Sequence, residues 1–293
     1  MAGESNEFQR LGKRELGRYA FETRMPKRVA TLLANESTTN STLGVISNLA
    51  LLLEGEPNTE LAYLCTHSAA QVSKLPSEGA HFCGYRNIQM MLLALAGSNK
   101  TGNSSAGMKS SIPEIQQMIE NAWEDGHNAH GKVLTGGIRG TRKHIGTSEA
   151  EAILLSLSIP CKGRAYVGAD AWKELLDAVE TYFTSSSIRT RPPGSRVIQT
   201  DLPPVFLQRP QHSLTIVGLE RTKSGKRYLV TFDPAWQAPS RMSEPLAKDN
   251  CKGWKARWLL RQYRKSERHL QRFRAFETLE VSPTGYDDFR ALI

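Results

Sequence analysis

Two strand-like runs joined by a short polar turn are the feature that most constrains how this chain can fold. Residues 212–219 and 227–233 are rich in β-branched and aromatic side chains, and Lys223-Ser224-Gly225-Lys226 lies between them. This pattern predicts an antiparallel β-hairpin. If the chain turns near residues 222–225, residues whose numbers sum to about 445–447 lie opposite each other. His212 and Asp233 then become cross-strand or diagonal neighbours.

Helical and strand-like patterns are mixed along the rest of the chain without βαβ regularity and without a repeat of fixed period. The expected elements are helices over residues 43–53, 84–96 and 172–183, a helix that begins at Pro113, strands over residues 60–65 and 161–167, and a loop over residues 185–204. Ser148 and Glu151 have capping-box spacing for one more helix. The predicted fold class is therefore α+β, with a flexible N-terminus over residues 1–14 and a single domain over residues 15–293.

Several classes of protein are disfavoured by what the sequence lacks. The longest apolar runs, residues 49–53 and 88–96, are shorter than the roughly 20 residues of a membrane span, and the first residues have no apolar core for a signal peptide. We therefore expect a soluble monomer in the cytoplasm, the nucleus or both, with no membrane partner. The four cysteines lack zinc or redox spacing, and His127-x-x-His130 has no third ligand, so neither a metal nor a cofactor is expected.

The positive charge of the chain is concentrated in one segment. The formal net charge is +9, and Lys252 to Arg274 holds nine basic residues and one acidic residue. Aromatic side chains recur near helical spacing within it, so we expect an amphipathic helix that packs Trp254, Trp258 and Tyr263 inward and exposes its cations. The alternative is a binding site for an acidic partner or a nucleic acid.

Cys83 stands at the junction between a loop and an apolar helix. Unpaired amide groups and the positive end of the helix dipole lower the pKa of a thiol there and help to bind a developing anion. Taken alone, Cys83 could be a buried structural cysteine. The predicted neighbours His212 and Asp233 change this interpretation, because a carboxylate that orients an imidazole beside a thiol is the arrangement of a cysteine nucleophile. The alternative for that pair is a core histidine with a hydrogen-bond partner.

The residues around Cys83 resemble a known motif. Cys-Gly-Tyr-Arg-Asn-Ile-Gln-Met-Met at residues 83–91 is similar to the nucleophile motif of the ZUFSP/UfSP cysteine peptidases, a papain-like group that acts on ubiquitin or on the ubiquitin-fold modifier. Similar segments follow in the family's order: Ile145-Gly-Thr-Ser-Glu149, Gln208-Arg-Pro-Gln-His212-Ser, Phe232-Asp233-Pro234 and the basic segment at residues 259–263. The resemblance covers most of residues 15–280 and implies a papain-like fold.

The resemblance also implies roles for individual residues. Cys83 would be the nucleophile, His212 the general base and acid, and Asp233 the carboxylate that orients it, while Gln208 would donate to the oxyanion. We expect Gly84 to leave room for the diglycine tail of the substrate. Glu149 and Asp125 are candidates to pair with arginines in that tail, and a solvated carboxylate is the alternative for each.

The choice of substrate depends on where the histidine lies. Proteases for the ubiquitin-fold modifier carry histidine soon after the aspartate, as Asp-Pro-His, whereas this chain has Asp233-Pro234-Ala235. The base must then come from His212, as in the deubiquitinase branch, so we expect cleavage after ubiquitin, including polyubiquitin. The alternatives are a protease for the ubiquitin-fold modifier and a non-catalytic protein that binds ubiquitin or nucleic acid. His81-Phe82, Gln211 and His144 depart from the family motif and leave tail binding open.

Overall fold

The fold is α+β, as expected. A computed structural model describes residues 10–36, 40–98, 110–186 and 189–282. The helices are α1 (Lys13–Leu16), α2 (Lys27–Ala34), α3 (Val45–Gly55), α4 (Cys83–Ser98), α5 (Ile112–Glu124), α6 (His130–Thr135), α7 (Thr147–Ser156), α8 (Ala171–Thr184), η2 (Ser240–Met242), η3 (Lys248–Cys251), α9 (Gly253–Tyr263) and α10 (Glu267–Leu270). The strands are β1 (Ser41–Thr42), β2 (Thr59–Leu64), β3 (Gln71–Val72), β4 (Cys161–Val167), β5 (Arg189–Thr190), β6 (Val197–Thr200), β7 (Val205–Arg209), β8 (His212–Thr222), β9 (Arg227–Phe232), β10 (Arg264–Ser266) and β11 (Ala275–Val281).

Within these residues, nine strands form one sheet around the long strand β8. β7 and β2 pair with successive parts of one edge of β8, and β9 pairs with its other edge. The last strand, β11, inserts between β4 and β7. These pairings are antiparallel, whereas β2 and β6 are parallel. One edge of β8 is therefore shared by two strands. β7 pairs with the first half of β8, and β2 pairs with its second half.

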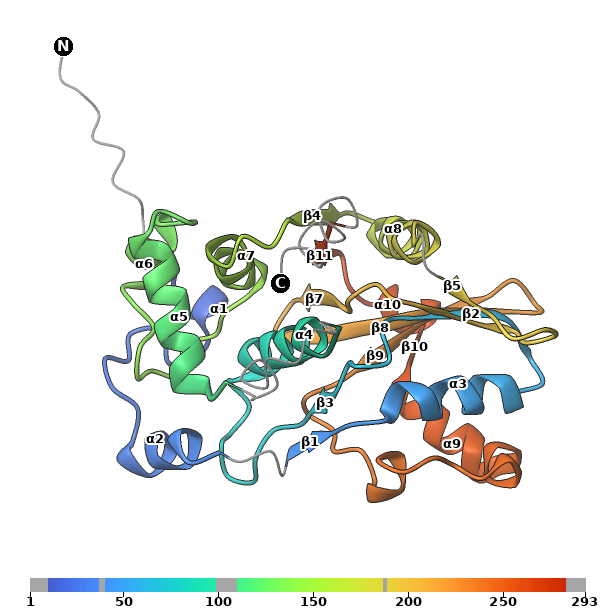
Figure 1. Ribbon diagram of the computed structural model, residues 1–293. Coiled ribbons are helices and arrows are strands. Elements are labelled where there is room, and N and C mark those ends of the chain that lie inside the picture. Colours follow the sequence, from blue (N-terminus) through green and yellow to red (C-terminus); the bar gives the residue numbers. More distant parts are fainter. Residues whose placement is uncertain (1–9, 37–39, 99–109, 187–188, 283–293) are drawn as a thin grey trace, which may run out of the picture.

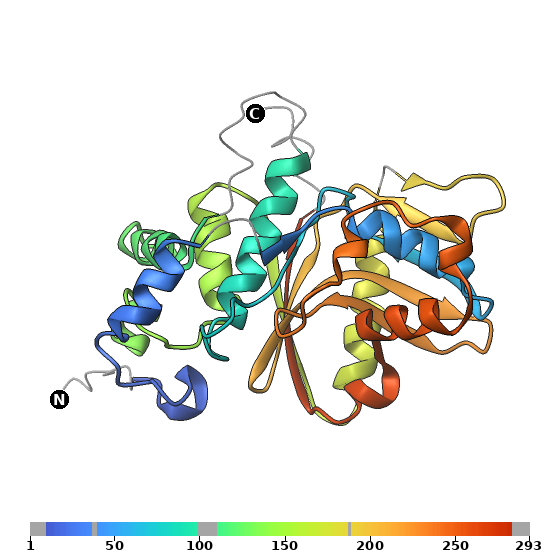
Figure 2. The ribbon, with the colours of Figure 1, turned by 90° about the horizontal axis from the view of Figure 1, so that it is seen from below.

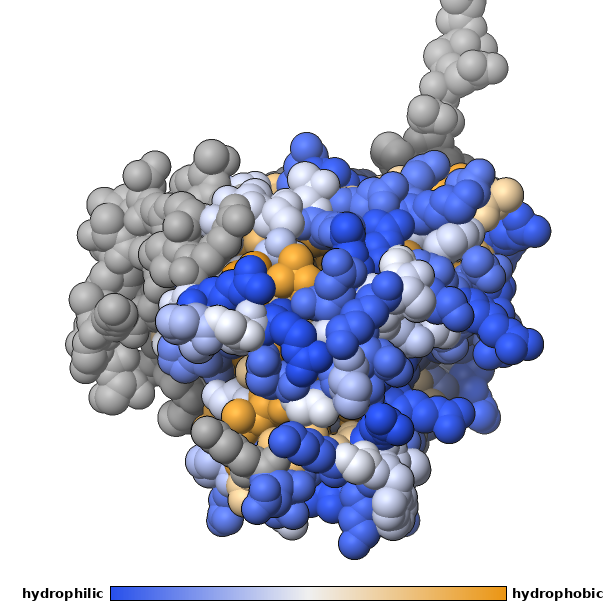
Figure 3. All heavy atoms as spheres, turned by 90° about the vertical axis from the view of Figure 1, so that its right-hand side faces the viewer, coloured by the Kyte–Doolittle hydropathy of each residue, from blue (hydrophilic) through white to orange (hydrophobic). Residues whose placement is uncertain are grey.

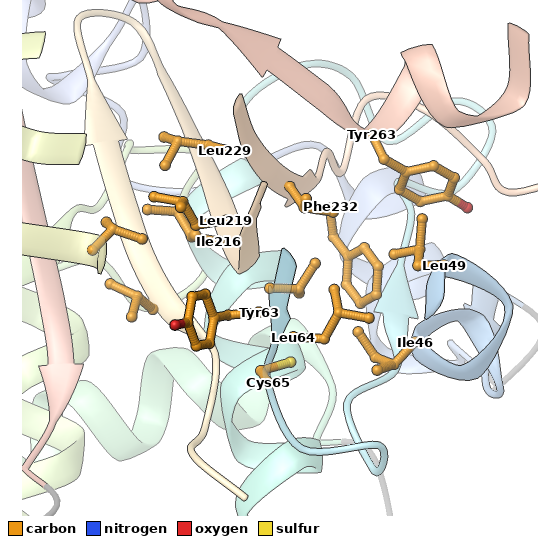
Figure 4. Close-up of a cluster of buried hydrophobic side chains, with 14 of the residues drawn as sticks. Ile46, Leu49, Tyr63, Leu64, Cys65, Ile216, Leu219, Leu229, Phe232 and Tyr263 are labelled. Atoms are coloured by element: carbon orange, nitrogen blue, oxygen red, sulfur yellow. The ribbon is translucent and has the colours of Figure 1, made fainter. Parts of the chain in front are cut away.

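Helices cover both faces of the sheet, and a second group of helices forms a separate half of the molecule. α3 and α9 lie on one face and α8 on the other, while α2, α5, α6 and α7 gather beyond α4 (Figures 1 and 2). One apolar core fills the sheet half, where Leu49 of α3 meets Leu64 of β2 and Phe232 of β9 (Figure 4). A second core joins α4 to α5 and α7. α4 contributes buried side chains to both cores, which explains why its sequence is apolar on nearly every side.

The predicted hairpin is confirmed, and its register contains an irregularity. Gly218 lies opposite Val230, whereas Ile216 lies opposite Thr231, so Val217 is the extra residue of a β-bulge. The shift makes His212 and Asp233 diagonal neighbours at the open end of the hairpin. The glycine beside the bulge is required by packing, because a Cβ on Gly218 would lie 2.2 Å from the carbonyl oxygen of Tyr63.

Local chemistry explains several helix starts, and it corrects one of the predictions. The Ser111 hydroxyl accepts from Glu114 N–H, and the Glu114 carboxylate accepts from Ser111 N–H, so α5 begins with a capping box and Pro113 in its first turn. The capping box expected at Ser148 and Glu151 is wrong. α7 begins two residues earlier than that pattern implies, after Gly146, because the Glu149 carboxylate accepts from Gly146 N–H at 2.8 Å.

Two other expectations about loops change. Residues 185–204 are not wholly a loop, because they contain β5 and β6; β6 adds parallel to β2 and buries Val197 and Ile198. A flexible N-terminus was expected over residues 1–14, and residues 1–9 of that segment lie outside the described residues. From Arg10 onward the chain is held, since Leu11 N–H donates to the Leu134 carbonyl and α1 begins at Lys13.

The basic segment differs from the expected single helix. α9 ends at Tyr263, after which β10 pairs with β9 and α10 forms a short turn of helix. Tyr263 is buried as expected, but the inward packing of Trp254 and Trp258 is wrong: their side chains are 73% and 50% exposed. The stripe that packs inward is Ala256, Leu259, Leu260 and Tyr263. At about 100° per residue, positions 254 and 258 then lie on the opposite side of the helix.

Candidate active site

Cys83 is the first residue of α4, the helix that packs against β8. The Arg86 N–H donates to the carbonyl of Phe82, which opens the helix. The amide groups of the first turn have no partner within the helix, so they and the positive end of the helix dipole face whatever lies at Cys83. The thiol is half-buried and free, as a nucleophile requires.

His212 and Asp233 are brought together as the hairpin predicted. His212 Nε2 lies 2.9 Å from Asp233 Oδ1, and both side chains are mostly buried. The imidazole also interacts with the Cys83 thiol, which lowers the pKa of Cys83 and raises that of His212. Because Nε2 is taken by the carboxylate, Nδ1 is the nitrogen available to sulfur. Thiol, imidazole and carboxylate therefore follow one another in the order that a cysteine peptidase needs.

The pKa values favour an ion pair between Cys83 and His212. Burial raises the pKa of the Cys83 thiol, but the hydrogen bond and charge of His212, with contacts from Ser213, hold it below its ordinary value. Burial lowers the pKa of His212, but bonds with Asp233 and Cys83 raise it to about 9. Both shifts favour a thiolate beside an imidazolium, which is the reactive form of such a pair.

The carboxylate of Asp233 is held by two further contacts. Its Oδ1 accepts from Ala235 N–H at 3.0 Å, and its Oδ2 lies 3.4 Å from Lys265 Nζ on β10. Burial raises the pKa of Asp233, but His212, Lys265 and the Ala235 N–H keep it well below its ordinary value. Lys265 was not predicted as a site residue, because only the pairing of β10 with β9 brings it here.

Gly84 lies where the nucleophile motif predicts, but the space beside it is occupied by the protein. A Cβ on Gly84 would lie 2.6 Å from the carbonyl oxygen of Ile145 and 2.7 Å from its Cγ1. The space on the Cβ side of this glycine is therefore filled by the loop before α7, which its small size allows to approach the start of α4. Room for the substrate tail beside Gly84 stays a prediction.

Gln208 lies on β7 directly opposite Ser213, whose backbone and side chain contact Cys83. Its Nε2 donates to the Arg209 carbonyl at 2.9 Å, and its Oε1 is buried with no hydrogen-bond partner among the described residues. The side chain also faces Gly146, since a Cβ there would be 3.7 Å from Oε1. Gln208 thus borders the site, and its role at the oxyanion stays a prediction. Ser213 was not identified from the sequence, although it follows His212.

The two acidic residues expected to bind the substrate tail have different positions. Glu149 is buried, burial raises its pKa, and its carboxylate caps α7 at Gly146. One oxygen of the carboxylate therefore caps the helix start, and the pairing of Glu149 with substrate arginines stays a prediction. Asp125 is exposed at the end of α5, and no contact in the described part of the chain joins it to the triad. Its role stays a prediction.

Two of the residues that depart from the family motif, His81 and His144, contact each other. His81 Nδ1 lies 3.3 Å from His144 Nε2, and the rings stack with centroids 5.5 Å apart. The Tyr19 ring also contacts the His81 ring in a T-shaped arrangement. Burial and the neighbouring His144 and Arg142 lower the pKa of His81 to about 4, so it is neutral at neutral pH. The pair joins the segment before Cys83 to the segment before α7.

The described ranges offer neither a metal-binding cluster nor a helix that could span a membrane. They hold no cluster of three or more His, Cys, Asp or Glu side chains placed to bind a metal ion. None of their helices has both the length and the apolar composition needed to cross a membrane.

Comparison with known proteins agrees with this site. Residues 58–279 match peptidase family C78, and this span includes Cys83, Gln208, His212 and Asp233. Zinc finger-containing ubiquitin peptidase 1 of Mus musculus is 34% identical over 197 residues, which are 64% of this chain and 32% of that protein. The protein of that name from Bos taurus is 36% identical over 174 residues, 57% of this chain and 29% of that protein.

The chain spans about a third of the length of these relatives. A solved structure of UfSP from C. elegans covers 80% of this chain with a TM-score of 0.49 and 13% identity, and 37% of that chain is matched. The family expected from the nucleophile motif is confirmed by the match over residues 58–279. The chain belongs to peptidase family C78.

Proposed function

We propose that this chain is a deubiquitinase that hydrolyses peptide and isopeptide bonds after the C-terminal diglycine of ubiquitin. The observation that carries the catalytic part is the hydrogen bond between His212 and Asp233, with Cys83 on the other side of the imidazole. Two relatives that are 34% and 36% identical to this chain over the matched residues are named ubiquitin peptidases, which supports ubiquitin as the substrate. The matched residues make up about a third of the length of each relative.

The source of the catalytic base also supports ubiquitin. His212 stands on β8, and position 235, where proteases for the ubiquitin-fold modifier would carry the histidine, is alanine. Ala235 acts through its backbone alone, by donating its N–H to Asp233.

The proposed reaction uses the thiolate and imidazolium in turn. The Cys83 thiolate attacks the carbonyl carbon of the terminal glycine, and the negative charge moves to the carbonyl oxygen. That oxygen meets the unpaired amides at the start of α4. The C–N bond then breaks as the imidazolium of His212 gives its proton to the leaving amine. A water molecule, deprotonated by the neutral imidazole, attacks the thioester, and release of the ubiquitin carboxylate restores the thiol.

Gln208 would assist at the oxyanion only after a change of partner. Its Nε2 now donates to the carbonyl of Arg209. Rotation of the amide toward the cysteine would supply a second donor for the developing charge. Replacement by glutamate keeps the shape but removes the N–H groups. Gln208→Glu should therefore lower kcat by about 10²-fold or more with little change in stability, the effect of losing one oxyanion donor.

Covalent capture tests the proposed function. Ubiquitin and the ubiquitin-fold modifier, each with a C-terminal electrophile, are incubated with the protein, and the adduct is located by mass spectrometry. We expect the ubiquitin probe to label Cys83 much the faster of the two. Cys83→Ala should abolish labelling, whereas Cys161→Ser should leave it unchanged, because burial raises the pKa of the Cys161 thiol to about 11. Preferential labelling by the other modifier would reassign the substrate, and labelling of Cys83→Ala would refute the mechanism.

A further inference from the structure

The exposed side of α9 carries two flat aromatic rings. Trp254 and Trp258 are 73% and 50% exposed, and they are one helical turn apart on the side opposite the buried stripe of α9. The other exposed large apolar side chains of the described chain lie outside α9: Phe21, Leu43, Val133, Leu155, Leu157 and Val167. The apolar surface of this helix is therefore limited to two indole rings and forms no broad patch.

Cations surround the two rings. α9 contains no acidic residue, and Lys252, Lys255, Arg257 and Arg261 at or beside it are all exposed. At about 100° per residue, Arg261 falls in line with the two tryptophans, with Arg257 and Lys255 on either side of that line. Lys255 Nζ lies 5.6 Å from the centre of the Trp254 ring. We call the surface formed by these four cations and two tryptophans the α9 face.

A basic hollow continues the α9 face toward the tip of the hairpin. It has a volume of about 580 Å³, and its lining includes the four cationic side chains Lys223, Lys226, Arg257 and Arg264. The one acidic side chain of the lining, Glu56, lies 3.6 Å from Arg257 and 3.7 Å from Arg264. Hydroxyl groups of Thr222, Ser224 and Tyr228 complete the wall. The hollow therefore offers a net positive charge and hydroxyl donors, which suits phosphate groups. The side of the molecule that contains this region is largely hydrophilic (Figure 3).

We propose that the α9 face and this hollow bind single-stranded nucleic acid. Each exposed indole provides a stacking surface for one base, and the cations of the hollow contact the backbone. Four residues of helix separate the backbone positions of Trp254 and Trp258 by about 6 Å along the helix axis, which exceeds the spacing of about 3.4 Å per nucleotide in a duplex strand. Stacking on both rings at that spacing would require bases that are pulled apart, which favours an extended single strand. An acidic peptide would satisfy the cations but would leave the two rings without a matching partner.

The proposed site extends away from the triad. Its outer end, with Lys223 and Lys226, lies at the turn between β8 and β9, about 33 Å from His212 along the eleven residues of β8 at 3.3 Å per residue. Its inner end reaches Arg264, the residue before Lys265, whose Nζ lies 3.4 Å from Asp233 Oδ2. The proposal does not depend on which modifier the enzyme cleaves.

Fluorescence polarisation of a labelled single-stranded DNA of about 16 nucleotides, at about 50 mM salt, tests the proposal. We expect the intact chain to bind and the Trp254→Ala/Trp258→Ala variant to bind at least about tenfold more weakly, from the loss of two stacked bases. Phe21→Ala removes an aromatic side chain that is 69% exposed elsewhere and is the matched control. Cys83→Ala should bind like the parent.

The charges of the hollow are tested separately. Lys223→Gln/Lys226→Gln should weaken binding and should lower the slope of log K against log salt by about one to two, one for each phosphate that is no longer neutralised. Thermal unfolding of each variant provides the folding control. Four results would overturn the proposal: no binding by the parent, equal binding of a duplex, unchanged binding by the tryptophan variant, or equally tight binding of polyglutamate, which would indicate an acidic protein partner instead.

Discussion

Replacing Gly84 by alanine tests how the start of α4 is held. The new Cβ would lie 2.6 Å from the carbonyl oxygen of Ile145, about 0.8 Å closer than ordinary contact. That oxygen belongs to the backbone, so the helix start or the loop before α7 must move. Overpacking of this kind costs about 1–3 kcal/mol. The higher helix propensity of alanine offsets at most about 1 kcal/mol. We therefore expect Gly84→Ala to lower the free energy of unfolding by about 1–2 kcal/mol.

The same shift should displace the thiol from His212. An error of about 1 Å in a reacting group can cost 10²-fold in rate. Urea unfolding followed by circular dichroism gives the stability, and alkylation of Cys83 by iodoacetamide gives the reactivity of the thiol without any substrate. The matched control is Gly163→Ala on β4, where the nearest atom to a new Cβ is 3.5 Å away. If Gly84→Ala kept its stability and thiol reactivity but raised KM, the glycine would accommodate the substrate after all, and the packing argument would be refuted.

Three further predictions follow from the described contacts. The pKa of His212 is raised to about 9, so kcat/KM for isopeptide cleavage should fall as the pH passes through 9 and the imidazolium loses its proton. A pH profile of kcat/KM that is still level at about pH 10.5 would contradict this. Glu220→Ala should cost about 3–5 kcal/mol in urea unfolding, because it removes the carboxylate that bonds most closely with the mostly buried Arg264. Glu124→Ala, which breaks an exposed pair, should leave the midpoint nearly unchanged. Trp258→Ala should lower the free energy of unfolding by under about 1 kcal/mol, since the side chain is half exposed, whereas Tyr263→Ala should lower it by about 3–5 kcal/mol. Equal losses of stability in thermal unfolding would place both rings in the core.

The sequence predicted the parts of the site that depend on local signals. Cys83 follows a loop and begins an apolar helix, and the hairpin turn sets the approximate register of His212 and Asp233. Both signals act over short stretches of chain, where periodicity and turn chemistry are informative. The bulge at Val217 was not predicted, but it moves the register by one residue only and leaves the two side chains adjacent.

The errors and omissions arise where distant segments decide the outcome. The loop that positions Gly146 makes Glu149 a helix cap, a role that its own sequence neighbours do not indicate. The approach of Ile145 to Gly84 likewise comes from another part of the chain. The inward direction of α9 depends on α3, so the aromatic content of the basic segment alone assigned Trp254 and Trp258 to the wrong side. Lys265 reaches Asp233 through strand pairing that its own sequence does not indicate.

The interior position of β11 has a consequence for synthesis of the chain. β4 joins the sheet through β11, in a register that runs from Ala275 opposite Val167 to Val281 opposite Cys161. β11 also pairs with β7, which aligns the first half of β8 and thus His212. A ribosome that has released the chain only as far as Leu270 has already delivered the cysteine, the histidine and the aspartate, but not the strand that joins the two parts of the sheet. Since strand pairing over long sequence separation forms late, we expect the nascent chain to be inactive and proteolytic activity to begin only after residue 281 has left the exit tunnel.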